Sequence, residues 1–137
     1  MHMKKIWCFS LVLVFLATGI CAAEVPNLLG KWAGVESWYG KVNESTKLIE
    51  DKSLNLTVEG QKDHLFTGNM TYIENGTKVV EGFSGAIGLD NKTLYIAEFK
   101  EGYDLGTITS NDDIELIYLE DGKMGGAEID RLHRIKA

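Results

Sequence analysis

Residues 52–59 read KSLNLTVE, and residues 65–76 read LFTGNMTYIENG. In the first run Leu54, Leu56 and Val58 alternate with polar residues, and the second run shows a similar alternation up to the dipeptide Asn75-Gly76. A period of two places apolar side chains on one face of a β-strand and polar side chains on the other. Asn-Gly tolerates the positive φ angles of a type I′ turn. The stretch therefore predicts antiparallel strands with one buried face, joined by tight hairpins.

The same pattern extends over the rest of the chain. Runs rich in Thr, Val, Ile, Tyr and Phe are separated by Gly, Asn and Asp, which form turns. They predict eight strands: Gly30–Trp38, Lys52–Glu59, Leu65–Ile73, Lys78–Ile87, Thr93–Phe99, Tyr103–Thr109, Ile114–Leu119 and Ala127–Ile135. The less regular segment Gly40–Glu50 predicts either a lid-like loop or a ragged hairpin. Leu28 and Leu29 fit a single helical turn.

The connections are short, so sequential strands are expected to pair as an up-and-down meander. Closing such a sheet removes its exposed edges. The predicted fold class is therefore all-β, a single eight-stranded antiparallel up-and-down barrel, with a two-sheet sandwich as the alternative. One face of the strands at 52–59 and 65–73 is polar, which is not typical of a membrane barrel.

The first 23 residues predict a cleaved secretory signal peptide. Lys4 and Lys5 precede the apolar stretch Ile6–Leu16, and the segment Ala17–Ala23, which contains small residues, follows it. Residues 24–137 then form a single exported domain, secreted, periplasmic or at the cell surface, with no transmembrane segment. Both cysteines, Cys8 and Cys21, lie in the signal, so the exported domain has no disulfide and no thiolate ligand.

Charge and motifs exclude several function classes. The net charge is −6, and it becomes −8 without Lys4 and Lys5. An acidic surface argues against nucleic acid and anionic membranes as partners. Beyond the signal the histidines are His64 and His133, and neither a His-Glu-x-x-His motif nor a phosphate-binding loop occurs. The sequence thus predicts no metal site, no cofactor and no catalytic residue; the oligomeric state stays open.

Acidic residues interrupt the apolar pattern within four predicted strands, at Glu81, Glu98, Asp104 and Glu115. Glu98 follows Leu94 and Ile96 at steps of two along the strand, so it faces inward if they do. It would then be a polar anchor in a ligand cavity. The simpler interpretation is that these acids face solvent.

Aromatic residues on or beside the strands are the better indication of a site. Tyrosine and tryptophan offer apolar bodies with polar tips, which suit a small organic ligand. The candidate ligand-binding residues are Trp38, Tyr72, Tyr95, Glu98, Tyr103 and Tyr118. A core filled by these side chains is the alternative.

Gly30-Lys31-Trp32 near the start, together with the run from Asp130 to Arg134, resembles the calycin superfamily of lipocalin, avidin and fatty-acid-binding barrels. The resemblance implies that Trp32 plugs the closed end of the barrel. It also implies that a basic residue of the last strand, Arg131 or Arg134, packs over this tryptophan and caps the N-terminal turn. The run Gly82–Gly85 is also similar to one in small exported microbial proteins, which implies no activity.

These observations lead to three functional hypotheses. The first is an exported, non-catalytic binding module that holds a small apolar or aromatic organic ligand in a calycin-like barrel. The second is a filled structural or interaction barrel that acts through its surface at the cell envelope. The third is an enzyme that uses carboxylates inside the barrel, which requires Glu98 and Glu115 to converge in one cavity.

Overall fold

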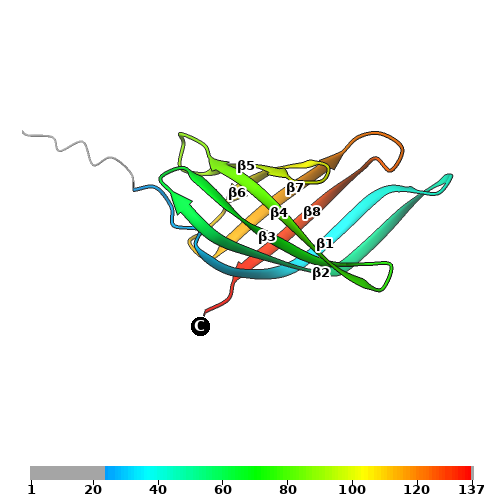
Figure 1. The fold of residues 1–137 in the computed structure, drawn as a ribbon, viewed down its shortest axis with the longest axis horizontal. Coiled ribbons are helices and arrows are strands. Elements are labelled where there is room, and N and C mark those ends of the chain that lie inside the picture. Colours follow the sequence, from blue (N-terminus) through cyan, green and yellow to red (C-terminus); the bar gives the residue numbers. More distant parts are fainter. Residues whose placement is uncertain (1–23, 137) are drawn as a thin grey trace, which may run out of the picture.

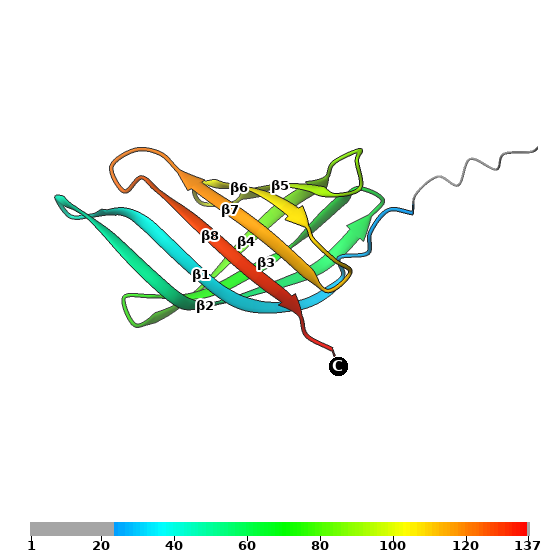
Figure 2. The ribbon, with the colours of Figure 1, turned by 180° about the vertical axis from the view of Figure 1, so that it is seen from behind.

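The structure, a computed structural model, describes residues 24–136, so the predicted signal peptide lies outside the described residues. Eight antiparallel strands form a closed barrel in sequence order, with β8 pairing back onto β1 (Figures 1 and 2). They are β1 (Gly30–Val42), β2 (Ser45–Lys62), β3 (Leu65–Glu74), β4 (Thr77–Ile87), β5 (Thr93–Glu98), β6 (Tyr103–Ile108), β7 (Asp113–Glu120) and β8 (Gly126–Arg134). The prediction of an all-β up-and-down barrel is confirmed. In the described range no helix has the length and apolar character needed to cross a membrane.

The hairpins follow the turn chemistry of the sequence. Asn75 and Gly76 join β3 to β4 with φ angles of 49° and 77°, as a type I′ turn requires. The irregular segment Gly40–Glu50 is a hairpin and not a lid, because β1 and β2 stay paired as far as Val42 and Ser45. The ladder between these two strands is interrupted by a register shift beyond Glu36.

The barrel has two distinct ends. The base end carries residues 24–29 and the connections β2–β3, β4–β5 and β6–β7 (Figure 1). The rim end carries the connections β1–β2, β3–β4, β5–β6 and β7–β8, and the β1–β2 hairpin projects there. Apolar side chains fill the interior towards the base and through the middle: Trp32, Leu54, Leu56, Val58, Phe66, Met70, Phe83, Ile87, Leu94, Ile96, Ile114, Leu116 and Leu132 are all buried.

Trp32 closes the base. Its indole is 1% exposed, and its Nε1 donates a hydrogen bond to the Leu28 carbonyl at 3.0 Å. The guanidinium carbon of Arg134 lies 4.1 Å from the ring centroid, a cation–π contact. Arg134 also donates to the carbonyls of Leu29 and Asn27, each at 2.7 Å. Arg134 is therefore the residue that packs over Trp32.

The other basic candidate lies elsewhere. The side chain of Arg131 is 62% exposed and pairs with Glu115 at 3.7 Å on the outside of the barrel. The expected helical turn at Leu28 and Leu29 is also absent, since residues 24–29 contain no helix. Side chains hold this segment across the base instead: Gln61 Oε1 accepts from the Leu28 amide at 2.7 Å, and its Nε2 donates to the Pro26 carbonyl at 2.7 Å.

Candidate functional site

The interior becomes acidic towards the rim. The strand positions that carry apolar core residues near the base carry carboxylates further along: on β1 Trp32 is followed by Glu36, and on β8 Leu132 is preceded by Asp130 and Glu128. The acidic interior, as we call it, consists of the inward-facing carboxylates Glu36, Glu81, Glu98, Asp104, Glu128 and Asp130. They come from β1, β4, β5, β6 and β8.

The interpretation that the strand acids face solvent is wrong for three of them. Glu81 and Asp104 are buried, and Glu98 is half-buried. The reason is strand parity, because Glu98 follows the buried Leu94 and Ile96 at steps of two. Burial of charge in this region is costly unless a partner compensates it.

Two lysines reach the acidic interior from the rim. Lys52 Nζ lies 3.5 Å from Glu36 Oε1, and Lys100 Nζ lies 3.9 Å from Glu81 Oε2. Both lysine side chains are substantially exposed, so water screens their charge. The negative charge of the acidic interior is therefore only partly balanced.

Glu81 is the best-satisfied of these acids. Its Oε1 accepts a hydrogen bond from the Lys100 amide at 2.8 Å, and its Oε2 accepts from the Tyr72 hydroxyl at 3.0 Å. Burial, followed by the bond to Glu81, raises the pKa of Tyr72, so this phenol stays a donor. Glu81 on β4 and Tyr72 on β3 therefore satisfy each other's hydrogen bonding inside the barrel.

Asp104 is in the opposite situation. It is 1% exposed, and neither of its carboxylate oxygens has a hydrogen-bond partner among the described residues. Burial and then the charge of Glu128 raise the pKa of Asp104 to about 7. Burial and then the charge of Asp104 raise the pKa of Glu98 to about 8. Protons or a bound cation can relieve this repulsion.

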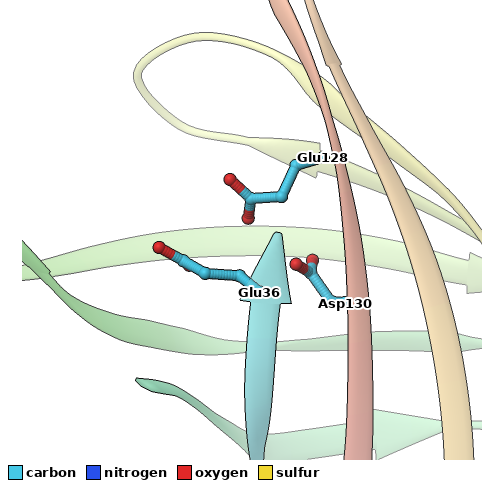
Figure 3. A group of neighbouring side chains, drawn as sticks. All are labelled: Glu36, Glu128 and Asp130. Carbon is cyan, nitrogen blue, oxygen red and sulfur yellow. The ribbon is translucent and has the colours of Figure 1, made fainter. Parts of the chain in front are cut away.

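The tightest grouping is the carboxylate triad, which consists of Glu36, Glu128 and Asp130. One carboxylate oxygen from each lies within 4.8 Å of the other two, and Figure 3 shows the three groups converging from β1 and β8. Glu36 pairs with Asp130 across the two strands, and Glu128 lies two residues before Asp130 on the same face. Burial and then the neighbouring Glu128 raise the pKa values of Glu36 and Asp130.

Four of the candidate ligand-binding residues lie inside the barrel or at its rim. Glu98 belongs to the acidic interior, and Tyr72 binds Glu81. Tyr118 is half-buried and donates to Glu120 at 3.2 Å. Trp38 is half-buried beside the rim, where its indole covers the backbone of two glycines, one on β1 and one on β8.

Tyr95 and Tyr103 do not join these residues. They are 51% and 52% exposed, because the alternation that buries Leu94, Ile96 and Asp104 turns them outward. Both line an open groove of about 340 Å³ on the outer face of β4, β5 and β6. The interior site predicted from the aromatics must therefore exclude them.

Glu115 is also on the outside, paired with Arg131, whereas Glu98 is inside. The pair that the enzyme hypothesis requires is therefore not formed. The triad residues were not singled out from the sequence. Their signal was parity: Glu36 lies four residues after Trp32, and Asp130 lies two before Leu132.

Comparison with known proteins supports the fold and goes no further. No family model matches the chain, and no curated protein does either. A redesigned β-barrel matches with a TM-score of 0.59 and 11% identity, covering 80% of this chain and 92% of that one. The S-type phycobiliprotein lyase CPES from Guillardia theta matches with a TM-score of 0.50 and 9% identity, covering 80% and 89%. This chain is a β-barrel.

Proposed function

We propose that the chain is an exported, non-catalytic binding module of the calycin kind, which holds a small cationic ligand in its acidic interior. The observation that carries this proposal is the buried Asp104, whose carboxylate has no partner among residues 24–136 although Glu98 and Glu128 repel it. A cation bound there would recover part of the electrostatic cost of burying these groups.

The distribution of side chains favours a cation over the apolar ligand expected from the sequence. The base half of the interior is filled by packed side chains, including Trp32, Phe83 and Leu116, which are at most 1% exposed. The remaining inward-facing groups, near the rim, are mainly carboxylates. Tyr72 donates to Glu81 and Trp38 lies opposite Glu128, so aromatic side chains, which attract organic cations, adjoin these carboxylates.

Calorimetric titration with butylammonium tests this proposal, with butyrate as a control of nearly equal size and opposite charge. We expect butylammonium to bind with a stoichiometry of one and butyrate not to bind, since the interior attracts only positive charge. The affinity should rise between about pH 6 and about pH 9, because Glu98 and Asp104 lose their protons in this range.

Two variants locate the binding. Glu98→Gln should weaken it, whereas Glu115→Gln, which removes an exposed acid on the outer face, should leave it unchanged. Equal binding of butylammonium and butyrate would contradict the proposal. Failure of both butylammonium and calcium ions to bind would favour the filled barrel that acts through its surface.

A further inference from the structure

We propose that the carboxylate triad of Glu36, Glu128 and Asp130 is a binding site for one divalent cation of the size of calcium. This inference rests on the proposed function, since it specifies which cation the acidic interior takes and where. It concerns a site that the sequence motifs did not predict.

The spacing of the triad fits such an ion. Its three carboxylate oxygens lie within 4.8 Å of one another (Figure 3). Calcium binds oxygens at about 2.3–2.6 Å, so three oxygens that bind one ion can be up to roughly 4.5 Å from one another, close to the spacing of the triad. Magnesium demands near-ideal octahedral geometry at about 2.0–2.1 Å and usually keeps several waters, whereas calcium accepts flexible arrangements of six to eight oxygens. The triad can therefore bind calcium with little movement of its strands.

A second observation is independent of the number of acids. Asp130 is 1% exposed, and its Oδ1 has no hydrogen-bond partner in the described part of the chain. Buried polar atoms nearly always have a partner, and an exception requires an explanation, of which a bound ion or water is one. A metal ion between Asp130, Glu36 and Glu128 supplies that partner.

The donor chemistry selects a hard cation. Carboxylate oxygens suit calcium, magnesium and manganese, whereas zinc prefers histidine and cysteine ligands. Carboxylates that bind in bidentate fashion, together with water, can supply the six to eight oxygens that calcium takes. Lys52 Nζ lies 3.5 Å from Glu36 Oε1, and because this lysine side chain is 38% exposed, water can solvate its ammonium group when a cation replaces it beside Glu36.

The β1–β8 pairing also supplies a spectroscopic reporter. Trp38 lies directly opposite Glu128 across the two strands. Terbium ions occupy calcium sites and emit when a nearby tryptophan is excited. A terbium ion in the triad should therefore give emission sensitised by Trp38, and calcium should displace it.

The test is a titration of the chelator-treated protein with calcium at about pH 8, by calorimetry and by loss of terbium emission. We expect one site, a preference for calcium over magnesium, and a loss of affinity of roughly 100-fold in Asp130→Asn and in Glu128→Gln. Glu115→Gln should bind as the parent does. Glu128 is only half-buried, so its variant tests the site even if Asp130→Asn fails to fold.

Three outcomes would overturn the inference. One is the absence of calcium and terbium binding to the parent protein. Another is undiminished binding by the folded Glu128→Gln variant. The third is an equal loss in Asp104→Asn and Glu128→Gln, which would indicate diffuse attraction in place of a coordinating triad. If butylammonium binds and calcium does not, the metal site is wrong and the cation-binding function stands; if neither binds, both fail.

Discussion

The ligand-free barrel is expected to lose stability as the pH rises from about 5 to about 9. In the folded state burial, and then the charge of Glu128, raise the pKa of Asp104 from 3.8 to about 7, and burial raises that of Glu98 to about 8. The native state then keeps protons that the unfolded chain has already lost. Their contribution to stability is complete below about pH 4 and is lost as the pH passes through 7 and 8. Between about pH 4 and about pH 8 the titration of Asp104 alone corresponds to a loss of roughly 4 kcal/mol, at about 1.4 kcal/mol per pH unit.

Exposed acids in the loops have lowered pKa values, so they destabilise the fold when the pH falls, and only at pH values below about 4. Hydrogen bonds from Thr93 lower the pKa of Asp90 to about 2, so its contribution is lost only when the pH falls below about 4. The loop acids therefore do not cancel the loss of stability that the buried acids cause at high pH.

Asp104→Asn tests the source of this pH dependence. The variant should be more stable than the parent at about pH 9 and close to it at about pH 4, because it removes a carboxyl group that is charged in the folded state only at high pH. Urea unfolding at several pH values, in a buffer with chelator, measures the difference. The control is Glu115→Gln, which removes an exposed acid. It should show the same change of stability with pH as the parent. A parent protein that is more stable at pH 9 than at pH 5 would rule out this account.

The second large effect is expected at the base of the barrel. Trp32→Ala should lower the free energy of unfolding by about 3–5 kcal/mol, the usual cost of truncating a buried large aromatic. Trp32 also carries the cation–π contact of Arg134 and the hydrogen bond to Leu28, so residues 24–29 should detach as well. Urea denaturation measures the loss, and hydrogen exchange of the Leu28 amide reports the detachment.

Trp38→Ala is the matched control, since this tryptophan is only half-buried at the rim. It should cost clearly less than Trp32→Ala, and it should leave the exchange of the Leu28 amide unchanged. Equal losses in the two variants would mean that the base plug has no special role in stability.

Much of the fold followed from local pattern. The alternation in residues 52–59 and the Asn75-Gly76 turn predict paired strands directly, because parity and turn conformation depend on neighbouring residues only. The segment Gly40–Glu50 was not settled in this way. Its hairpin depends on pairing between β1 and β2, beyond the register shift that follows Glu36.

The site was predicted less completely than the fold. Glu98 was recognised as inward-facing if Leu94 faces inward, but the same parity rule places Tyr95 outside. The choice between Arg131 and Arg134 required the register of β8 against β1, in which Arg134 pairs with Trp32. The sequence alone does not decide whether an acidic residue at an inward-facing strand position is buried. The same residue occurs there whether the strand turns it to solvent or the barrel interior uses its charge.

The sequence by itself determined the alternation of side chains, most of the turns and the pairing of sequential strands, because these depend on interactions within and between adjacent segments. Only the tertiary structure decided that acids from β1, β4, β5, β6 and β8 share one interior. The physical reason is closure: β8 pairs with β1 only when the sheet curves into a barrel, and this brings Asp130 and Glu128 beside Glu36, about 90 residues earlier in the chain. Their mutual repulsion, and the cation site proposed from it, exist only in that closed form.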